Sequence, residues 1–260
     1  MTMAGCVCPH PPLLIPEIGG AERDRVQATV DGLERLADEL GEIDCAVVIS
    51  PHTRGRWDAF TVKSPPRLYG DFSMFGCRRA GLEIANDTEF VDSLVELALA
   101  EGVALDPSDD DELDHGVLVP LSFLAARRLV SLSIVDRHAD HVAMGTLVRR
   151  CADQLGRAVT FVASGDLSHR LIPTAPAGYD QRGAEFDHQV VEHLAVGDFP
   201  ALSHLEPDLL RRAGECGLRS FIALGAFLGD DAQVNPHLLS YEGPFGVGYA
   251  VAAYGTPQKP

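Results

Sequence analysis

The apolar run Ala46-Val47-Val48-Ile49 constrains the fold of this chain more than any other stretch. Consecutive apolar and β-branched residues are typical of a strand that is covered on both faces. Apolar patterns predict further strands at residues 4–8, 58–63, 130–135 and 157–163 and on both sides of Glu242. Helical periodicity predicts helices over residues 21–40, 87–101, 139–155, 180–196, 205–213 and 220–228. Because strands and helices alternate along the chain, we predict the α/β fold class.

Composition favours one domain over residues 1–260. The chain is 46% hydrophobic, and no linker, internal repeat or low-complexity segment divides it. Its 21 Lys and Arg against 38 Asp and Glu give a net charge of −17, which argues against a nucleic-acid partner because phosphate is repelled. We expect no membrane helix, which needs roughly 18 apolar residues in a row, and no signal peptide. Six cysteines in this context predict a reduced, cytoplasmic protein without disulfides.

Some segments have a simple structural interpretation. Residues 64–80 are rich in Pro, Gly and aromatic side chains, which predicts an ordered loop over a pocket. The acidic run from Asp106 to Glu112 is interpreted as a solvated loop, because its spacing is not that of a calcium-binding loop. Six histidines in polar contexts are expected on the surface: His138, His141, His188, His193, His204 and His237.

The other four histidines lie in rigid stretches rich in Gly or Pro, and they are His10, His52, His115 and His169. Those at positions 10, 52 and 169 follow the ends of predicted strands. Open α/β sheets place their ligands at strand ends that border loops. His115 stands between an Asp and a Gly at the start of an apolar helix, which is unusual for a surface residue. We therefore interpret these four imidazoles as parts of one site.

Glu242 is the candidate that completes a metal site with two of these histidines. It ends a predicted strand and precedes a Gly-Pro turn, which holds its carboxylate in place. His10, His52 and Glu242 provide the two imidazoles and one carboxylate typical of mononuclear non-haem Fe(II), with positions left open for substrate and dioxygen. Zinc uses the same ligand types, so an oxygenase and a hydrolase remain alternatives. His115 and His169 are then free to move protons, because imidazole titrates near neutral pH.

The motifs around these residues resemble the class III extradiol dioxygenase superfamily, the LigB-like family typified by the catalytic subunit of protocatechuate 4,5-dioxygenase. The matching stretches span nearly the whole chain in the family's order: Pro9-His10-Pro11-Pro12, Ser50-Pro51-His52, Asp114-His115-Gly116, Ser164-Gly165-Asp166-Leu167-Ser168-His169 and Tyr241-Glu242-Gly243. The resemblance is closest to the LigB-like domain of AmmeMemoRadiSam gene neighbourhoods. That domain has look-alikes of Glu215-Cys216-Gly217 and of the stretch from Tyr241 to Tyr249. Memo-type proteins are more distant relatives.

This resemblance implies a single three-layer α/β/α domain with a central, mostly parallel or mixed sheet. It implies that His10, His52 and Glu242 hold Fe(II). His169 would be the catalytic acid and base, and His115 would line the pocket and steady the substrate. The implied reaction uses dioxygen to open the ring of a catechol or aminophenol-like aromatic in an apolar pocket. The candidate pocket aromatics are Tyr69, Phe72, Phe75, Tyr179 and Phe245. A homodimer is expected by analogy with such enzymes.

Departures from the family pattern leave alternatives open. Memo-type relatives carry a Cys in place of the Glu and bind metal without an assigned ring cleavage. In this chain Cys216 stands in a Glu-Cys-Gly loop, and we interpret it first as a packing residue or a neighbour of the ligands. Asp166 is interpreted as orienting the loop that carries His169. The alternatives to an Fe(II) dioxygenase are a zinc-dependent hydrolase on the same ligands and a Memo-like metal-binding protein without ring cleavage.

Overall fold

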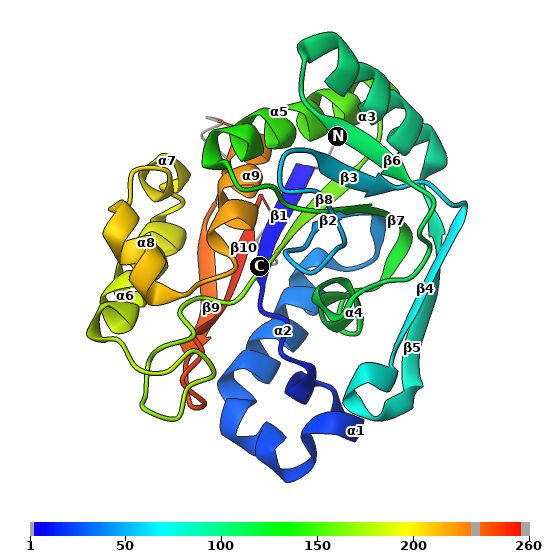
Figure 1. The fold of residues 1–260 in the computed structure, drawn as a ribbon. Coiled ribbons are helices and arrows are strands. Elements are labelled where there is room, and N and C mark those ends of the chain that lie inside the picture. Colours follow the sequence, from blue (N-terminus) through cyan, green and yellow to red (C-terminus); the bar gives the residue numbers. More distant parts are fainter. Residues whose placement is uncertain (1–2, 230–234, 256–260) are drawn as a thin grey trace.

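The computed structural model describes residues 3–229 and 235–255, and a ten-stranded sheet forms the centre of the fold (Figure 1). Its main path runs in the order β4-β5-β7-β2-β8-β1-β10-β9, and β3 pairs with β6 and β7 beside it. The strands are β1 (Met3–Cys8), β2 (Ile43–Ile49), β3 (Phe60–Lys63), β4 (Arg67–Phe72), β5 (Cys77–Asn86), β6 (Leu105–Ser108), β7 (Ala126–Leu132), β8 (Val159–Ser164), β9 (His237–Glu242) and β10 (Tyr249–Tyr254). The central pairs from β5 to β1 are parallel, whereas β4–β5, β1–β10 and β10–β9 are antiparallel. The predicted α/β class with a mostly parallel, mixed sheet is confirmed.

Helices cover both faces of the sheet. One face carries α3 (Thr88–Glu101), α5 (His138–Leu155) and α9 (Leu218–Leu228), and the other carries α2 (Gln27–Leu40) and α4 (His115–Leu121) (Figure 1). Near β9, α6 (Gln181–Val196) packs against α7 (Phe199–Leu202) and α8 (Pro207–Ala213). The shorter turns are α1 (Pro16–Gly19), η1 (Pro12–Leu14), η2 (Gly20–Val26) and η3 (Ser73–Phe75). Across the part of the chain that the structure describes, no helix combines the length and apolarity needed to cross a membrane.

β2 shows why its apolar run predicts this architecture. Successive side chains of a strand point to opposite faces, so Val47 and Ile49 pack in the apolar cluster beneath α3, α5 and α9. Ala46 and Val48 pack in the second cluster, beneath α2 and α4. Each fully buried Val or Ile side chain stabilises the fold by about 1.5–3 kcal/mol relative to leaving it exposed. A strand of this composition is therefore stable only with helices on both sides.

Three predicted segments differ from the structure. The acidic run from Asp106 to Glu112, expected as a loop, begins inside β6, which pairs with β3. Residues 64–80, expected as a loop, contain β4 and the start of β5, which form an antiparallel hairpin joined by η3. Buried and exposed positions alternate along β4, and Leu68 and Phe72 are buried. The many Gly and aromatic residues of this segment hid this alternation, which is the sequence signal of a strand. The helix expected over residues 21–40 begins at Gln27, because Gly20–Val26 form 3-10 turns instead.

The neighbouring parallel strands β1, β8 and β2 end at one edge of the sheet. In the sheet register Cys8 pairs with Ser164, and Ile49 pairs with Ala163. The chain segments that follow these strands therefore leave the sheet side by side. His10, His52 and residues 166–169 lie in these segments, at the carboxyl edge where open α/β sheets bind ligands.

Candidate metal centre

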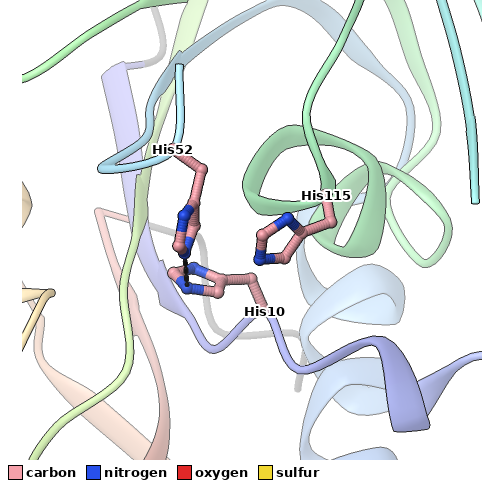
Figure 2. A group of neighbouring side chains, drawn as sticks. All are labelled: His10, His52 and His115. Atoms are coloured by element: carbon pink, nitrogen blue, oxygen red, sulfur yellow. Dashed lines mark hydrogen bonds between the residues drawn. The ribbon is translucent and has the colours of Figure 1, made fainter. Parts of the chain in front are cut away.

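Three imidazoles, those of His10, His52 and His115, point toward one another at this edge (Figure 2). Each offers a ring nitrogen, and these atoms all lie within 4.8 Å of one another. The Nε2 atoms of His10 and His52 are 3.0 Å apart, and the ring centroids of His52 and His115 are 4.0 Å apart. Two ligands at right angles on a metal with bonds of about 2.1 Å lie roughly 3 Å apart. The spacing of His10 and His52 therefore suits a shared metal ion.

Ser164, the last residue of β8, determines the tautomer of His10. Its hydroxyl donates to the carbonyl oxygen of Gly116 over 2.5 Å, so it accepts from Nδ1–H of His10 over 2.9 Å. With the proton on Nδ1, Nε2 of His10 presents a lone pair to the cluster. Metal-binding histidines are usually oriented by such a bond to their second nitrogen. The backbone N–H of His10 also donates to Oδ1 of Asp166 over 3.0 Å, which fixes the main chain at this point.

Asp114 joins the two segments that carry His52 and His115. Its Oδ1 accepts from a backbone N–H in the first turn of α4 and from the Ser50 hydroxyl, both over 2.8 Å. Its Oδ2 accepts from the Thr53 hydroxyl over 2.6 Å. The Ser50 hydroxyl in turn accepts from the backbone N–H of His52 over 3.1 Å. Asp114 therefore orients both imidazoles by holding the loop after β2 against the start of α4.

All three imidazoles are held in the neutral form that binds metal. Burial, and next the neighbouring His52, lowers the pKa of His10 to about 3. The same two causes lower the pKa of His115 to about 4, and burial lowers the pKa of His52. The approach of His10 Nε2 to Asp166 Oδ2 at 3.9 Å is therefore no ion pair at neutral pH. Neutral imidazoles are the form of histidine that binds metal, so this donor set fits a divalent transition metal.

Glu242, expected as the third ligand, does not lie in this cluster. Among residues 3–229 and 235–255, the side chains whose ligand atoms gather around one point are His10, His52 and His115. Oε1 of Glu242 instead accepts from both the backbone N–H and the hydroxyl of Thr29, each over 2.6 Å. The N-cap residue of α2 is Val26, whose side chain makes no capping bond. Glu242 therefore caps α2 from a distant strand, and its negative charge suits the N-terminus of a helix.

Strand order explains the position of Glu242. β10 separates β9, which ends at Glu242, from β1, which leads to His10. Adjacent strands lie about 4.8 Å apart, so β9 lies roughly 10 Å from β1 within the sheet. The residues next to a carboxylate at a strand end do not indicate whether its side chain contacts a helix or a metal. The structure thus groups His10 and His52 with His115 and holds Glu242 against Thr29, and the ligand set of His10, His52 and Glu242 stays a prediction.

His169 and Cys216 border the imidazole cluster. The charge of His169 contributes to the lowered pKa of both His10 and His52, so His169 lies within electrostatic range of them. Nδ1 of His169 is buried and has no hydrogen-bond partner within the described residues. Sγ of Cys216 lies 3.7 Å from Nε2 of His10, and burial raises the pKa of this thiol. Cys216 therefore approaches the cluster, as its Glu-Cys-Gly loop suggested.

Two glycines bring the Cys216 loop to this position. A Cβ atom on Gly165 would lie 2.1 Å from Cα of Gly217, so the two backbones touch where no side chain fits. The backbone N–H of Gly217 donates to the carbonyl oxygen of Asp166 over 3.0 Å, and that of Cys216 does so over 3.4 Å. In the sequence, this contact involves the dipeptides Gly165-Asp166 and Cys216-Gly217. Each glycine permits a close backbone approach, but nothing in either dipeptide indicates that the other is its partner.

A cavity of about 210 Å³ opens beside His52 and His115. Phe75 lines it and packs edge-on against the His115 ring, with centroids 5.2 Å apart. Lys63, also in the lining, is buried and donates to Oδ2 of Asp110 over 2.9 Å. The remaining lining residues are Arg54, Asp71, Met74, Glu112, Leu113 and Asp114. The pocket expected to be apolar therefore carries many charged side chains, and it is smaller than the roughly 300–1,000 Å³ typical of sites for drug-sized ligands.

The expectation for one histidine is wrong. His141, expected on the surface, is fully buried on α5. Its Nδ1–H donates to the carbonyl oxygen of Arg137 over 3.0 Å, and its Nε2 accepts from the N–H of Val135 over 3.4 Å. Phe72, a pocket candidate whose side-chain type is more often found in the core, packs in the apolar core. The error for His141 arises because the polarity of its neighbours in sequence does not report which residues pack on it in the fold.

Comparison with known proteins assigns this chain to a family. The model of the catalytic LigB subunit of aromatic ring-opening dioxygenase matches residues 4–252. The chain belongs to this family. LigB dioxygenases are metal-dependent, and the matched residues of this LigB family member contain the imidazole cluster and the adjoining cavity. The resemblance inferred from the sequence motifs is confirmed.

Two similar proteins place this LigB family member among its relatives. Protein CA_C1420 of Clostridium acetobutylicum is 30% identical over 262 residues, which cover 94% of this chain and 55% of that protein. The chain thus spans about half the length of this curated relative. The crystal structure of the uncharacterized protein JW3007 from Escherichia coli K12 matches with a TM-score of 0.64 and 19% identity, covering 96% of this chain and 99% of that one. At this identity the structural match shows the fold alone.

Proposed function

We propose that this LigB family member is a non-haem Fe(II)-dependent, extradiol-type dioxygenase that opens the ring of a catechol or aminophenol-like aromatic. The observation that supports this most is the convergence of three neutral imidazoles, on His10, His52 and His115, beside His169, whose Nδ1 has no hydrogen-bond partner among the described residues. Imidazole ligands suit iron, and fewer than six protein ligands leave coordination positions for substrate and dioxygen. Residues 1–260 would form one domain with this activity.

The metal ligands in this proposal are His10, His52 and His115. A metal held there supplies adjacent binding positions and a path for electrons between the aromatic substrate and dioxygen. The hydroxyl of Ser164 keeps the proton of His10 on Nδ1, and the hydrogen bonds of Asp114 hold the other two imidazoles in register. These bonds preorganise the ligands, so little movement is needed when a metal binds.

His169 is proposed as the general acid and base. A buried polar atom without a partner costs about 1–3 kcal/mol, and Nδ1 of His169 is such an atom. A hydroxyl of the bound substrate would satisfy it, and the imidazole would accept the hydroxyl proton and later return it to the opened product. The same nitrogen therefore recognises the substrate and moves its proton.

The cavity supports a small, polar aromatic substrate. Its volume of about 210 Å³ suits a single ring, and Phe75 offers an aromatic wall beside His115. Lys63 donates to the carboxylate and to the carbonyl oxygen of Asp110, over 2.9 and 3.3 Å. An ammonium has three donors, so the third N–H of Lys63 is available to a polar substituent on the ring.

A zinc centre is the second candidate, and Cys216 is the observation that favours it. A thiol 3.7 Å from Nε2 of His10 adds a sulfur donor to three imidazoles, and zinc accepts sulfur and nitrogen ligands in tetrahedral sites. With an open position this centre would activate water in a hydrolase, and with four protein ligands it would be a binding site without ring cleavage. Metal analysis of the purified protein, combined with Cys216→Ser, separates the two: zinc retained by the wild type and lost in the variant favours this candidate.

Anaerobic reconstitution with Fe(II), followed by a panel of catechols and aminophenols in the presence of oxygen, tests the primary proposal. We expect oxygen uptake and a yellow ring-opened product from at least one substrate. His169→Ala should abolish turnover while iron content stays at the wild-type level, and His188→Ala, at an exposed position of α6, serves as the matched control. Iron-loaded protein that consumes no oxygen with any member of the panel contradicts the proposal.

A further inference from the structure

The Tyr241-Glu242-Gly243 motif does not contribute a ligand atom to the imidazole cluster, although the sequence singles it out. Glu242 turns toward α2, where it contacts Thr29. The hydroxyl of the preceding residue, Tyr241, donates to Oδ2 of Asp187 on α6 over 2.7 Å. Neighbouring residues of β9 thus contact different helices. Asp187, the partner of Tyr241, also bonds to Ser168, which directly precedes His169.

Asp187 connects this tyrosine to the loop of the proposed acid and base. Only 1% of Asp187 is exposed, so its carboxyl group depends on internal hydrogen bonds. Oδ1 accepts from the backbone N–H of Ser168 over 2.8 Å, while Oδ2 accepts from Tyr241. Ser168 directly precedes His169. Asp187 therefore fixes the main chain one residue before the imidazole.

Close backbone contacts leave the Ser168 segment little room to move. Gly183 lies one helical turn before Asp187 on α6, and a Cβ atom there would lie 2.5 Å from Oγ of Ser168. A Cβ atom on Gly248 of the adjoining turn would lie 2.0 Å from Oδ2 of Asp187. The backbone N–H of Gly248 also donates to the carbonyl oxygen of Ser168 over 2.9 Å. Of the three residues that contact Ser168 here, Gly183, Asp187 and Gly248, Asp187 is the one with an ionisable side chain.

A second anchor comes from the end of α8. The Ser168 hydroxyl donates to the carbonyl oxygen of Ala213 over 2.8 Å, and the backbone N–H of His169 approaches the same oxygen at 3.2 Å. These bonds fix the backbone nitrogen of His169. The direction of its side chain still depends on the backbone conformation at Ser168. Loss of the Asp187 bond would let that path shift without removing the Ala213 anchor.

We propose that Asp187 is a positioning residue for His169, which it holds through the N–H of Ser168 with its own carboxyl group braced by the hydroxyl of Tyr241. The inference rests on the proposed role of His169 as acid and base. In this proposal, Tyr241 of the Tyr241-Glu242-Gly243 motif supports His169 by way of Asp187. A displacement of about 1 Å at a reacting group can lower a rate by about 100-fold, so an anchor of this kind bears directly on turnover.

Burial and hydrogen bonding act in opposite directions on the pKa of Asp187. Burial raises the pKa of this carboxyl group to about 7, and the donors Ser168 and Tyr241 oppose that shift. Asn is therefore the natural conservative replacement. Its amide oxygen accepts from Ser168 as Oδ1 does now, and its NH₂ group donates to the Tyr241 oxygen. Asp187→Asn should keep the loop in place, whereas Asp187→Ala removes both bonds.

Histidine ring NMR on the full chain tests the proposal without relying on turnover. The His169 signals are assigned by their loss in His169→Gln, and they are compared at one pH in Asp187→Ala, Asp187→Asn and Tyr241→Phe. We expect Asp187→Ala to shift the His169 signals, with the signals of His10 and His115 unmoved. Asp187→Asn should restore the wild-type spectrum. Glu192→Ala, on the exposed face of α6, is the control.

Turnover provides a second readout once a substrate is found. Asp187→Ala should lower kcat about 10- to 100-fold with KM changed little, because substrate binding is retained while His169 is misplaced. His169 signals that stay unmoved in folded Asp187→Ala overturn the proposal, as do shifts of equal size at His10 and His115. If Asp187→Ala does not fold, Tyr241→Phe decides alone, and an unmoved His169 signal in it overturns the proposal. Absence of turnover on every aromatic contradicts the dioxygenase function and leaves the NMR result to decide the positioning role.

Discussion

The Ser164 hydroxyl lies 2.9 Å from Nδ1 of His10 and donates its own proton to the carbonyl oxygen of Gly116. It can therefore only accept from the imidazole. The orientation of a proposed metal ligand thus depends on the last residue of β8, which pairs with Cys8 two residues before His10. Parallel pairing of β1 with β8 brings the hydroxyl and the imidazole together.

Ser164→Ala should weaken metal binding. Without the acceptor at Nδ1, the His10 ring loses its tautomer preference and its orientation, and the metal affinity should fall about 10- to 100-fold. Competition with a chromophoric chelator measures this affinity. Ser131→Ala is the matched control, because Ser131 is buried on β7 and its hydroxyl has no hydrogen-bond partner within the described residues. Equal affinities in the two variants would contradict the role of Ser164.

His115→Ala distinguishes a metal ligand from a residue that only lines the pocket. The position of His115 within the imidazole cluster predicts a loss of metal affinity larger than the roughly 10- to 100-fold expected for a residue that merely orients a ligand. Metal content after dialysis and chelator competition measure it, with His52→Ala as the comparison. Wild-type affinity combined with a raised KM would instead assign His115 to substrate binding alone.

Glu242→Ala should destabilise the fold and leave metal affinity unchanged. It removes the carboxylate that accepts from the N–H of Thr29 in the first turn of α2, and loss of a cap costs about 0.5–2 kcal/mol. Urea unfolding at neutral pH measures the free energy of unfolding. Glu242→Gln, which keeps an acceptor oxygen, should lose less. A folded Glu242→Gln protein that no longer holds metal would show that this carboxylate leaves Thr29 to act as a ligand.

Acid should destabilise the metal-free protein partly through His141. Burial lowers the pKa of His141 to about 3 from the ordinary 6.5, so below pH 6.5 the unfolded chain takes up a proton that the folded protein excludes. Stability is therefore fully present above this range and is lost as the pH falls toward 3. From about pH 7 to about pH 5 the loss from this group is on the order of 2 kcal/mol.

His141→Gln isolates that contribution. Gln does not titrate, and it can both donate to the carbonyl oxygen of Arg137 and accept from the N–H of Val135. His10 and His115 also have lowered pKa values, but they contribute equally in both proteins. The variant should therefore lose about 2 kcal/mol less than the wild type between about pH 7 and about pH 5. Parallel stability curves for the two proteins would contradict the assignment.

The fold class and the positions of His10 and His52 after strands follow from local patterns. β2 is predictable because its residues face two cores, and such a strand needs an apolar run regardless of its neighbours. His10 and His52 are predictable because each follows a strand and is held by a proline-containing loop. The β4–β5 hairpin was less accessible, since its buried positions include Gly70, which carries no hydrophobic signal.

By itself, the sequence determined the α/β class and the strands after which His10 and His52 lie. Only the tertiary structure decided that His115 rather than Glu242 joins His10 and His52, that Cys216 comes within 3.7 Å of His10 and that His141 is buried. The physical reason is that a residue's neighbours in space depend on strand order. Insertion of β10 between β1 and β9 moves Glu242 two strand spacings away from His10 and beside the start of α2. No local pattern of residues encodes that order.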